Sequence, residues 1–456
     1  MISIDTIVAL STPPGIGAIG VIRLSGKDAI NITNEVFSGK DLRSQESHTL
    51  HFGTIKDGLK VIDEVVVSLF VAPKSYTKEN VVEISCHGSN YIIQQIISLL
   101  IRKGASAAKP GEFTLRAFLN GSLDLSQAEA VADLISSDSA AAHQVAMNQL
   151  RGGFSTELNV LRNQLIHFAS MIELELDFAE EDVEFANRDQ LQALISKINV
   201  VINKLIRSFE LGNVIKTGIN TVIAGRPNAG KSTLLNALLN DDRAIVSEIA
   251  GTTRDTIEEI LNIGGINFRL IDTAGIREAT DAIEAIGVEK TMQKINQSAL
   301  LVYLFDVVSM SVSEIQEDIT SLHKPGVTML AIANKIDLSY DDRLKELALP
   351  TDIKFMAISA KANQQVEELK QLIYESAVGD QLSDNHTMVT NIRHVEALQK
   401  TRTALDSVMN GLDNPVTSDF LAMDIKQALY YLGEITGQVT TDDLLENIFS
   451  KFCIGK

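Results

Sequence analysis

The sequence contains few cysteines and no long apolar run. Its 456 residues include two cysteines, Cys86 and Cys453, which are too few for a disulfide framework and favour a reducing compartment. No stretch approaches the ~20 apolar residues that a membrane span needs. The first residues, Met1–Val8, show neither a secretory nor a transit pattern. We therefore expect a cytoplasmic protein that does not enter a membrane.

Positive charge is scarce as well. Lys and Arg number 40 against 59 Asp and Glu, so the formal net charge is −19. This balance argues against a large fixed surface for nucleic acid. If the protein acts on RNA, we expect a more basic partner or a small basic patch. A local acidic cluster between Glu173 and Glu184 is typical of a solvated helix end, with a cation or partner site as the alternative.

Hydrophobic patterning divides the chain into about three domains, one of them in two parts. Residues 1–118 combine short β-type runs with one helical stretch, which predicts a compact α+β domain. Residues 119–214 and 381–456 predict one discontinuous all-α domain, whose first helix is expected to begin at the capping-box pattern Ser126–Glu129. Residues 215–380 alternate apolar strands with helical patterns, which is typical of an inserted, doubly wound α/β domain with a parallel sheet.

The octet Gly225–Ser232 reads G-R-P-N-A-G-K-S and follows the apolar run Thr221–Ala224. In the matching pattern G-x-x-x-x-G-K-S, glycines allow a tight turn that points successive N–H groups at phosphate oxygens. We expect Lys231 to reach the β- and γ-phosphates and the Ser232 hydroxyl to bind Mg²⁺. The residues from Thr233 onward can begin a helix whose N-terminal dipole favours an anion. The octet therefore predicts binding of a nucleoside triphosphate.

Two further motifs follow predicted strands. Asp272–Gly275 reads D-T-A-G, and we expect Asp272 to hold Mg²⁺ through water and the Gly275 N–H to approach the γ-phosphate. Asn334–Asp337 reads N-K-I-D. A carboxylate at Asp337 can accept hydrogen bonds from the N1–H and N2–H₂ groups of guanine, and adenine offers no such pair of donors. The second motif therefore favours GTP over ATP.

Two more segments complete the predicted nucleotide site. Ser359–Lys361 is expected to close over the base, and Gly251–Asp255 supplies a switch threonine for Mg²⁺. All these motifs lie at the carboxyl ends of strands, where such sheets bind ligands. The residues predicted to bind GTP are Asn228, Ala229, Gly230, Lys231, Ser232, Thr233, Ser247, Glu248, Ile249, Ala250, Gly251, Thr252, Thr253, Asp272, Thr273, Ala274, Gly275, Asn334, Lys335, Asp337, Ser359, Ala360 and Lys361.

The residue after D-T-A-G is unusual for a GTPase. Ras-like GTPases place a glutamine there to orient the attacking water, whereas this chain has Ile276, which cannot form a hydrogen bond. Either hydrolysis is slow or another polar group takes the role. The following stretch offers three carboxylates, Glu278, Asp281 and Glu284.

Three segments outside the nucleotide motifs resemble one known family. They read E-F-T-L-R-A-F-L-N at Glu112–Asn120, L-S-Q-A-E-A-V at Leu125–Val131 and F-C-I-G-K at Phe452–Lys456. Together with the octet they are similar to the MnmE (TrmE) family of tRNA modification GTPases, and the resemblance runs from Asp5 to Lys456. It implies a multidomain fold with an N-terminal folate-binding domain, a discontinuous helical domain and an inserted Ras-like P-loop GTPase domain.

The resemblance also implies partners and a reaction. The family forms homodimers through the N-terminal domain and works with the flavoprotein MnmG. Together they add an aminomethyl or carboxymethylaminomethyl group to C5 of the wobble uridine, U34, of certain tRNAs. A tetrahydrofolate derivative, in the 5,10-methylene or 5-formyl form, supplies the one-carbon unit.

For hydrolysis, the resemblance implies dependence on K⁺ as well as Mg²⁺. The oxygen ligands of K⁺ match Asn228, Ser247, Ile249 and Thr252. Those of Mg²⁺ match Ser232, Thr253 and, through water, Asp272. The water-orienting glutamate of the family matches Glu284. A K⁺ ion beside the phosphates would stabilise developing charge much as an arginine finger does.

The family's folate-binding positions match Arg23, Glu83, Ser122 and Lys456. A carboxylate can pair with the pterin's amino and ring N–H groups, and cations suit the glutamate tail of the folate. Ser122 is a departure, because the family usually has a basic residue there, and this leaves the local contact with the tail open. The family places Cys453 near the folate, where a catalytic role and simple packing are the alternatives.

Two other functions share part of this pattern. A ribosome-assembly GTPase would carry a basic RNA-binding appendage, which the acidic helical segments do not supply. A folate-dependent aminomethyl-transfer enzyme in which GTP is only regulatory stays open.

Overall fold

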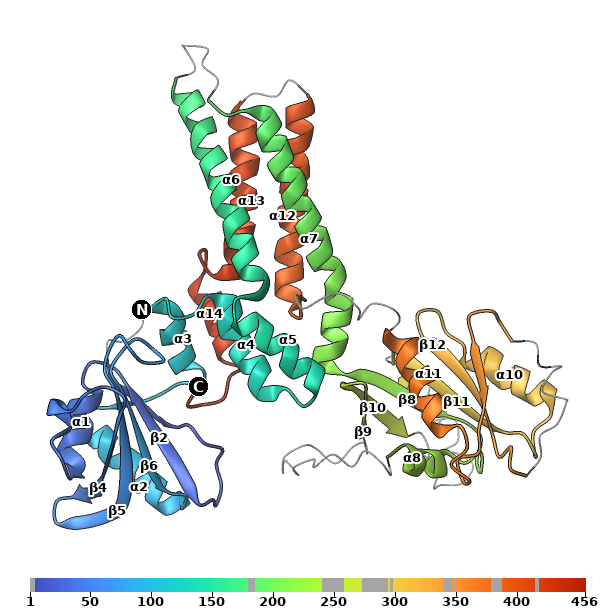
Figure 1. Cartoon of the computed structure of the whole chain (residues 1–456), viewed down its shortest axis with the longest axis horizontal. Coiled ribbons are helices and arrows are strands. Elements are labelled where there is room, and N and C mark those ends of the chain that lie inside the picture. The colour runs from blue at the N-terminus through green and yellow to red at the C-terminus, as the bar shows by residue number, and fades with distance from the viewer. Residues whose placement is uncertain are drawn as a thin grey trace. The chain divides into compact units, whose positions relative to one another are not determined.

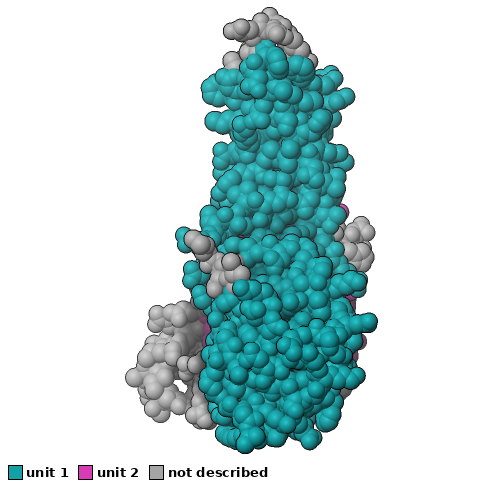
Figure 2. Space-filling view, turned by 90° about the vertical axis from the view of Figure 1, so that its left-hand side faces the viewer, with its two compact units in different colours: residues 1–135, 149–202, 396–456 teal, residues 136–148, 203–395 magenta. Residues whose placement is uncertain are grey.

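The computed structural model describes most of the chain (Figure 1). The described residues are 5–178, 185–239, 258–272, 294–295, 298–338, 347, 349–378, 388–414 and 418–456. The chain divides into two compact units, the first of Met1–Ile135, Gln149–Ile202 and Glu396–Lys456 and the second of Ser136–Asn148 and Asn203–Val395 (Figure 2). Each unit contains a β-sheet with helices packed on it.

The sheet of the first unit has seven strands in the order β3-β4-β5-β6-β2-β1-β7. They are β1 Ile7–Leu10, β2 Ile19–Ser25, β3 Phe37–Ser38, β4 Thr49–Asp57, β5 Lys60–Phe70, β6 Val81–His87 and β7 Ser106–Ala107. Neighbouring strands are antiparallel, except for β1 and β7. Apolar side chains alternate along β5, so Val65, Val67 and Leu69 are buried in one core with α1 (Ala29–Val36) and α2 (Asn90–Arg102). The α+β class predicted for this part is confirmed.

Helices make up the rest of the first unit and continue into the second. After the 3₁₀-helix η1 (Leu42–Ser44) they are α3 Glu112–Leu119, α4 Leu125–Ser136, α5 Ala140–Leu150, α6 Gly153–Asp177, α7 Arg188–Thr217, α12 Ile392–Asp413, α13 Ser418–Thr436 and α14 Asp442–Phe449. In Figure 1, α6, α7, α12 and α13 lie side by side as a bundle. Along α13, which packs on α6, the stripe Leu421, Ile425, Ala428 and Leu432 is buried. None of the described helices combines the length and apolar character that crossing a membrane requires.

Helix α4 begins at Leu125, one residue before the capping-box pattern at Ser126, and its cap differs from the predicted one. The Asp124 carboxylate accepts a hydrogen bond from the Gln127 N–H at 2.8 Å, and the Gln127 side chain accepts one from the Asp124 N–H at 2.9 Å. Asp and Gln thus form the reciprocal pair in place of Ser and Glu. Ser126 lies inside the first turn and donates to Asp124 at 2.8 Å.

The sheet of the second unit has six strands in the order β13-β12-β11-β8-β10-β9. They are β8 Ile219–Ala224, β9 Glu258–Ile263, β10 Ile266–Asp272, β11 Leu300–Asp306, β12 Thr328–Asn334 and β13 Lys354–Ala357. All pairings are parallel except that of the edge strand β9 with β10. One apolar core joins the sheet to α8 (Lys231–Leu239) and α11 (Val366–Val378), and another joins it to α10 (Val312–Leu322). The predicted doubly wound α/β fold is confirmed, with an antiparallel edge strand added.

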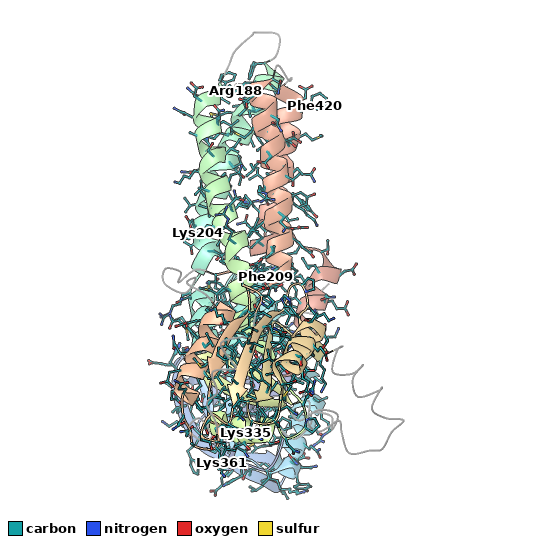
Figure 3. The ribbon with its side chains drawn as sticks, turned by 90° about the vertical axis from the view of Figure 1, so that its right-hand side faces the viewer. Arg188, Lys204, Phe209, Lys335, Lys361 and Phe420 are labelled. Atoms are coloured by element: carbon teal, nitrogen blue, oxygen red, sulfur yellow. The ribbon has the colours of Figure 1, made fainter. Side chains whose placement is uncertain are left out.

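One acidic residue of the predicted solvated cluster is buried instead. Glu175, near the end of α6, is 7% exposed and accepts hydrogen bonds at 2.5–2.8 Å from the Phe185 and Ala186 N–H groups and from Arg188. These hydrogen bonds replace those that water would form with the carboxylate, and so offset the free-energy cost of burying its charge. Figure 3 shows Arg188 at one end of the helical bundle. Glu173 is 47% exposed, as predicted, and the acidic residues of the cluster after 178 lie outside the described residues.

Replacing the buried carboxylate is therefore expected to destabilise the bundle. Glu175→Ala leaves the Arg188 guanidinium and two N–H groups without this acceptor, so we expect the free energy of unfolding to fall by about 3 kcal/mol in urea denaturation. Glu173→Ala, which removes only an exposed pair with Lys426, serves as the control and is expected to cost less than about 0.5 kcal/mol. Equal effects of the two substitutions would contradict this account of Glu175.

Candidate functional site

The predicted phosphate loop, Gly225–Gly230, runs from the end of β8 to the start of α8. Its two glycines are the motif glycines, and neither leaves room for a side chain. A Cβ on Gly225 would lie 2.1 Å from the Leu304 carbonyl oxygen, and one on Gly230 would lie 2.3 Å from the side-chain nitrogen of Asn334. Gly230 also has a φ of 101°, which residues with a Cβ rarely adopt. The shape of the loop therefore requires glycine at both positions.

The Asn334 side chain joins three of the predicted segments. Its Nδ2 donates to the Ala229 carbonyl of the phosphate loop at 2.8 Å, and its Oδ1 accepts from the Ala360 N–H at 3.0 Å. Asn334 is the last residue of β12 and is only 3% exposed. The phosphate loop, the N-K-I-D motif and the S-A-K segment thus meet at one buried amide.

The side chains predicted to face the phosphates lie at the start of α8. The Lys231 ammonium donates to the carbonyls of Gly225 at 2.8 Å and Arg226 at 3.1 Å, so it lies over the loop. Ser232 and Thr233 lie in the first turn of α8, where both are exposed. Asn228, the predicted K⁺ ligand of the loop, is exposed and has a φ of 62°. Asparagine adopts this left-handed conformation more readily than most residues do.

The two motifs predicted to hold the base are also in contact. The Ser359 hydroxyl donates to Asp337 Oδ1 at 2.6 Å and accepts from the Ala362 N–H at 3.1 Å. This contact orients the carboxylate whose predicted role is to accept the guanine N–H groups. Lys335 and Lys361, one from each motif, lie at the same end of the unit (Figure 3).

Asp306, at the end of β11, is a part of this region that the sequence analysis missed. It is 7% exposed and accepts a hydrogen bond from Lys335 Nζ at 2.7 Å and another from the Val308 N–H at 2.9 Å. Burial favours the neutral carboxyl, but the hydrogen bonds, that from Lys335 foremost, outweigh it and lower the pKa of Asp306. Asp306 therefore fixes the side chain of the lysine in N-K-I-D. The only signal in the sequence is a charged residue closing an apolar strand.

Arg226 of the phosphate loop makes a second unpredicted contact. Its guanidinium binds Asp318 through two hydrogen bonds, at 2.9 and 3.1 Å, and Glu314 through one at 2.6 Å. Both acids lie on α10, and Asp318 also accepts from the Tyr303 hydroxyl at 2.8 Å. Hydrogen bonds from Ser311 and Arg226 lower the pKa of Glu314 to about 2. The cluster anchors the phosphate loop to α10.

Several predicted ligands cannot be placed. Asp272 is the last residue of β10, and its backbone alone is described. The predicted residues that lie outside the described residues are Ser247, Glu248, Ile249, Ala250, Gly251, Thr252, Thr253, Thr273, Ala274, Gly275 and Glu284. Most of the K⁺ and Mg²⁺ ligands and the predicted catalytic glutamate therefore stay predictions.

In the first unit, two of the four predicted folate positions contact each other, and a third follows directly after a residue that one of them contacts. Arg23 on β2 and Glu83 on β6 face each other in the antiparallel pair, and the guanidinium binds Glu83 Oε1 at 2.8 and 2.9 Å. Arg23 also donates to the Gly455 carbonyl at 3.3 Å. Lys456, the next residue, is half-buried. The Arg23 side of this ion pair therefore contacts a backbone segment that lies 432 positions away from it in the sequence.

The segment 453–456 is held closely against the first sheet. Gly455 has a φ of 92°, and a Cβ there would lie 2.1 Å from the Leu10 carbonyl oxygen. The Gly111 N–H donates to the Cys453 carbonyl at 3.3 Å, and the Cys453 thiol is exposed. Cys86 is buried, which raises the pKa of its thiol to about 11 and keeps it protonated. Of the two thiols, only that of Cys453 is thus accessible.

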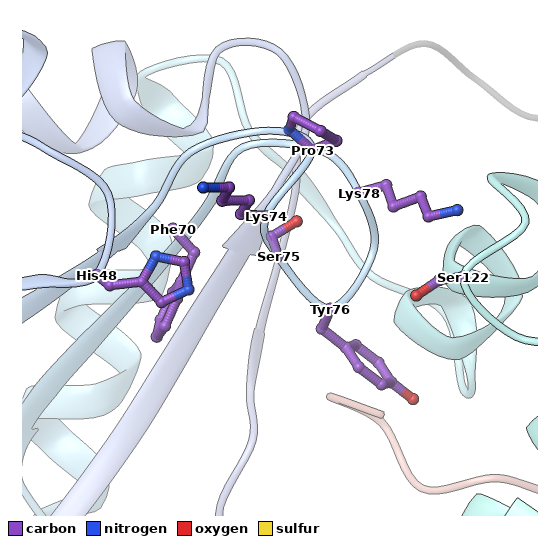
Figure 4. A pocket seen from close by; sticks show the side chains of 8 residues that line it. All are labelled: His48, Phe70, Pro73, Lys74, Ser75, Tyr76, Lys78 and Ser122. Carbon is purple, nitrogen blue, oxygen red and sulfur yellow. The ribbon is translucent and has the colours of Figure 1, made fainter. Parts of the chain in front are cut away.

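Ser122, the fourth predicted folate position, lies in a cavity of about 550 Å³ (Figure 4). The cavity is lined by His48, Phe70, Pro73, Lys74, Ser75, Tyr76, Lys78 and Ser122. The guanidinium carbon of Arg23 lies 5.8 Å from the centre of the Tyr76 ring. Tyr76 therefore contacts Arg23 and also lines the cavity that contains Ser122.

Comparison with protein families matches nearly the whole chain. The family described as GTP-binding protein TrmE N-terminus matches residues 6–122, and the MnmE helical domain matches residues 125–453. The chain is 60% identical over 452 residues to the tRNA modification GTPase MnmE of Cytophaga hutchinsonii, and the match covers 99% of this chain and 98% of the relative. It is 57% identical over 465 residues to the protein of the same name from Flavobacterium psychrophilum, with 100% of both chains covered.

Among solved structures, the chain is similar to a single-residue variant of Era from Aquifex aeolicus bound to GDP·AlF₄⁻. The two are 26% identical, and the match covers 42% of this chain and 67% of that chain, with a TM-score of 0.29.

The Asn334 amide gives a test of how the nucleotide segments are held together. Asn334→Ala leaves the buried Ala360 N–H and the Ala229 carbonyl without their partner, so we expect about 3 kcal/mol less stability and at least about tenfold weaker binding of a fluorescent guanine nucleotide. Asn236→Ala, on the exposed face of α8, is the control and should change both by little. Unchanged nucleotide binding by Asn334→Ala would show that this bridge does not position the site.

Proposed function

This chain belongs to the MnmE (TrmE) family of tRNA modification GTPases. From this membership we propose that it hydrolyses GTP in a K⁺-dependent reaction and takes part in modifying the wobble uridine of certain tRNAs. GTP hydrolysis is the activity that its relatives' name gives. The observation that supports it in this chain is the Asn334 amide, which holds the phosphate loop and both base motifs together. Asp337, oriented by Ser359, would accept the guanine N–H groups.

The described part of the phosphate loop fits a triphosphate. Gly225 and Gly230 let the backbone turn tightly, and the N-terminus of α8 would direct N–H groups and a positive dipole at the phosphates. Lys231, which lies over the loop carbonyls, would turn to the β- and γ-phosphates. The arrangement suits an anion with several oxygens.

We propose that hydrolysis follows the in-line path of phosphoryl transfer. The water oxygen bonds to the γ-phosphorus, the bond to the bridging oxygen breaks, and GDP and phosphate leave. Glu284 would orient the water in place of the glutamine that Ile276 replaces. Ser232, Thr253 and Asp272 would hold Mg²⁺, and Asn228, Ser247, Ile249 and Thr252 would hold K⁺. These ions supply positive charge where negative charge develops.

The modification site would lie in the first unit. We propose that a 5,10-methylene- or 5-formyltetrahydrofolate binds with its pterin paired to Glu83, beside Arg23 and Lys456, and with its other end at the region of Ser122. The contacts of Arg23 with Glu83 and with the Gly455 carbonyl support this proposal, because they bring two of the predicted positions next to the residue that precedes a third. Cys453, with an exposed thiol, is the candidate for a direct chemical role.

We also propose the family's organisation for this chain. Its domains would be 1–118 for folate binding and dimerisation, 119–214 with 381–456 for the helical part, and 215–380 for GTP. It would act in the cytoplasm as a homodimer with the flavoprotein MnmG, and tRNA would bind through that complex. A basic partner is consistent with the net charge of −19.

Potassium dependence can be measured by phosphate release at saturating GTP in KCl and in NaCl. We expect turnover at least about tenfold faster in KCl, because a bound cation stabilises the transition state. Asn228→Gly, which keeps the positive φ but removes the amide oxygen, should abolish the difference. Glu284→Ala should lower kcat about a hundredfold, whereas Glu317→Ala, an exposed acid on α10, should not. Equal rates in the two salts would exclude the K⁺ mechanism.

Nucleoside mass spectrometry of tRNA tests the pathway. Cells that lack this gene are expected to lose the C5-modified wobble uridine, and the wild-type gene should restore it. Glu83→Gln should not restore it, because the neutral amide cannot pair with the pterin as a carboxylate does. Glu64→Gln, an exposed change on the neighbouring strand, is the control. Normal modification in cells without the gene would reject the tRNA assignment.

A further inference from the structure

The loop before β6 and the turn after α3 are joined by two hydrogen bonds. The Asn120 side chain donates to the Thr77 carbonyl at 2.7 Å. In the opposite direction, Lys78 Nζ donates to the Gly121 carbonyl at 2.6 Å. The Lys78 ammonium therefore lies at the residue that precedes Ser122, the position where the family usually has a basic residue and where the contact with the folate tail was left open.

The backbone of Lys78 is in a conformation that does not favour lysine. Its φ is 57°, in the left-handed region that glycine adopts without strain and residues with a Cβ disfavour. Folding alone would be better served by glycine at this position. Glycine is therefore a substitution that the backbone accepts at this position.

The surroundings of Lys78 suit an anion. The cavity of about 550 Å³ is lined by two lysines, Lys74 and Lys78, with the hydroxyl groups of Ser75 and Ser122, and its lining includes no carboxylate among the described residues (Figure 4). Ser122 itself offers a hydroxyl but no charge. Tyr76 lines the cavity and lies beside Arg23, so the cavity is next to the Arg23–Glu83 pair.

We propose that Lys78 binds the glutamate-tail carboxylates of the reduced folate and so supplies the positive charge that Ser122 lacks. This inference rests on the proposed folate site at Arg23 and Glu83. A folate whose pterin lies at that pair would extend past Tyr76, and its carboxylates would reach the cavity. The bond to Gly121 holds the ammonium at the cavity until a carboxylate replaces the carbonyl as its acceptor.

Lys78→Gly tests the proposal without harming the fold, because glycine relieves the positive φ. Binding to the full-length protein would be measured by isothermal titration calorimetry with 5-formyltetrahydrofolate and with 5-formyltetrahydropteroate, which lacks the glutamate. We expect an unchanged or higher melting temperature, about fivefold weaker binding of the folate and unchanged binding of the pteroate. The double variant Lys78→Gly/Ser122→Lys should regain the lost affinity. Lys40→Gly, which removes an exposed lysine outside the cavity, should bind both probes as the wild type does.

The other outcomes are distinct. Wild-type affinity for the folate in Lys78→Gly would overturn the role of Lys78 and leave the folate site standing. Equal weakening of both probes would overturn the assignment to the tail. Absence of folate binding by the wild-type protein would reject the proposed folate site, and the role of Lys78 with it.

Discussion

The return of residues 452–456 to the first sheet is the constraint that organises the first unit. Gly455 lies so close to Leu10 that no side chain fits, and its carbonyl accepts hydrogen bonds from Ser11 and Arg23. Because segments from the two ends of the sequence meet there, the long helices between them run out and back (Figure 1). The α/β sheet enters the chain between α7 and α12, so the helical part is discontinuous in sequence although it forms one bundle.

Polar side chains hold the loops of the second unit in place where apolar packing ends. The central strands β11 and β12 are buried on both faces, but the loops at their carboxyl ends lie at the surface. Arg226 anchors the phosphate loop to α10, Asp306 holds Lys335, and Ser359 holds Asp337. Each contact fixes a predicted ligand-binding segment through a side-chain hydrogen bond. This preorganisation is what a phosphate site needs, because catalysis there depends on positioning.

The sequence predicts the elements with strong local signals and misses those set by tertiary contacts. The apolar runs of β11 and β12 and the glycines of the phosphate loop are recognisable, because burial and backbone conformation restrict residue type directly. Burial of Glu175 is not, because its donors come from beyond the helix that carries it. The same holds for the positive φ of Lys78, which only the fold determines.

The buried Asn334 amide has a consequence for how ligand fragments would bind. Its Nδ2 bonds to Ala229 of the phosphate loop and its Oδ1 to Ala360 of the S-A-K segment. If a shift of one segment moves the amide, the amide's hydrogen bond to the other segment is disturbed as well. Guanosine and pyrophosphate, offered as separate molecules, would both favour the same position of this side chain. Their binding would therefore be linked, and each would raise the affinity for the other by the same factor.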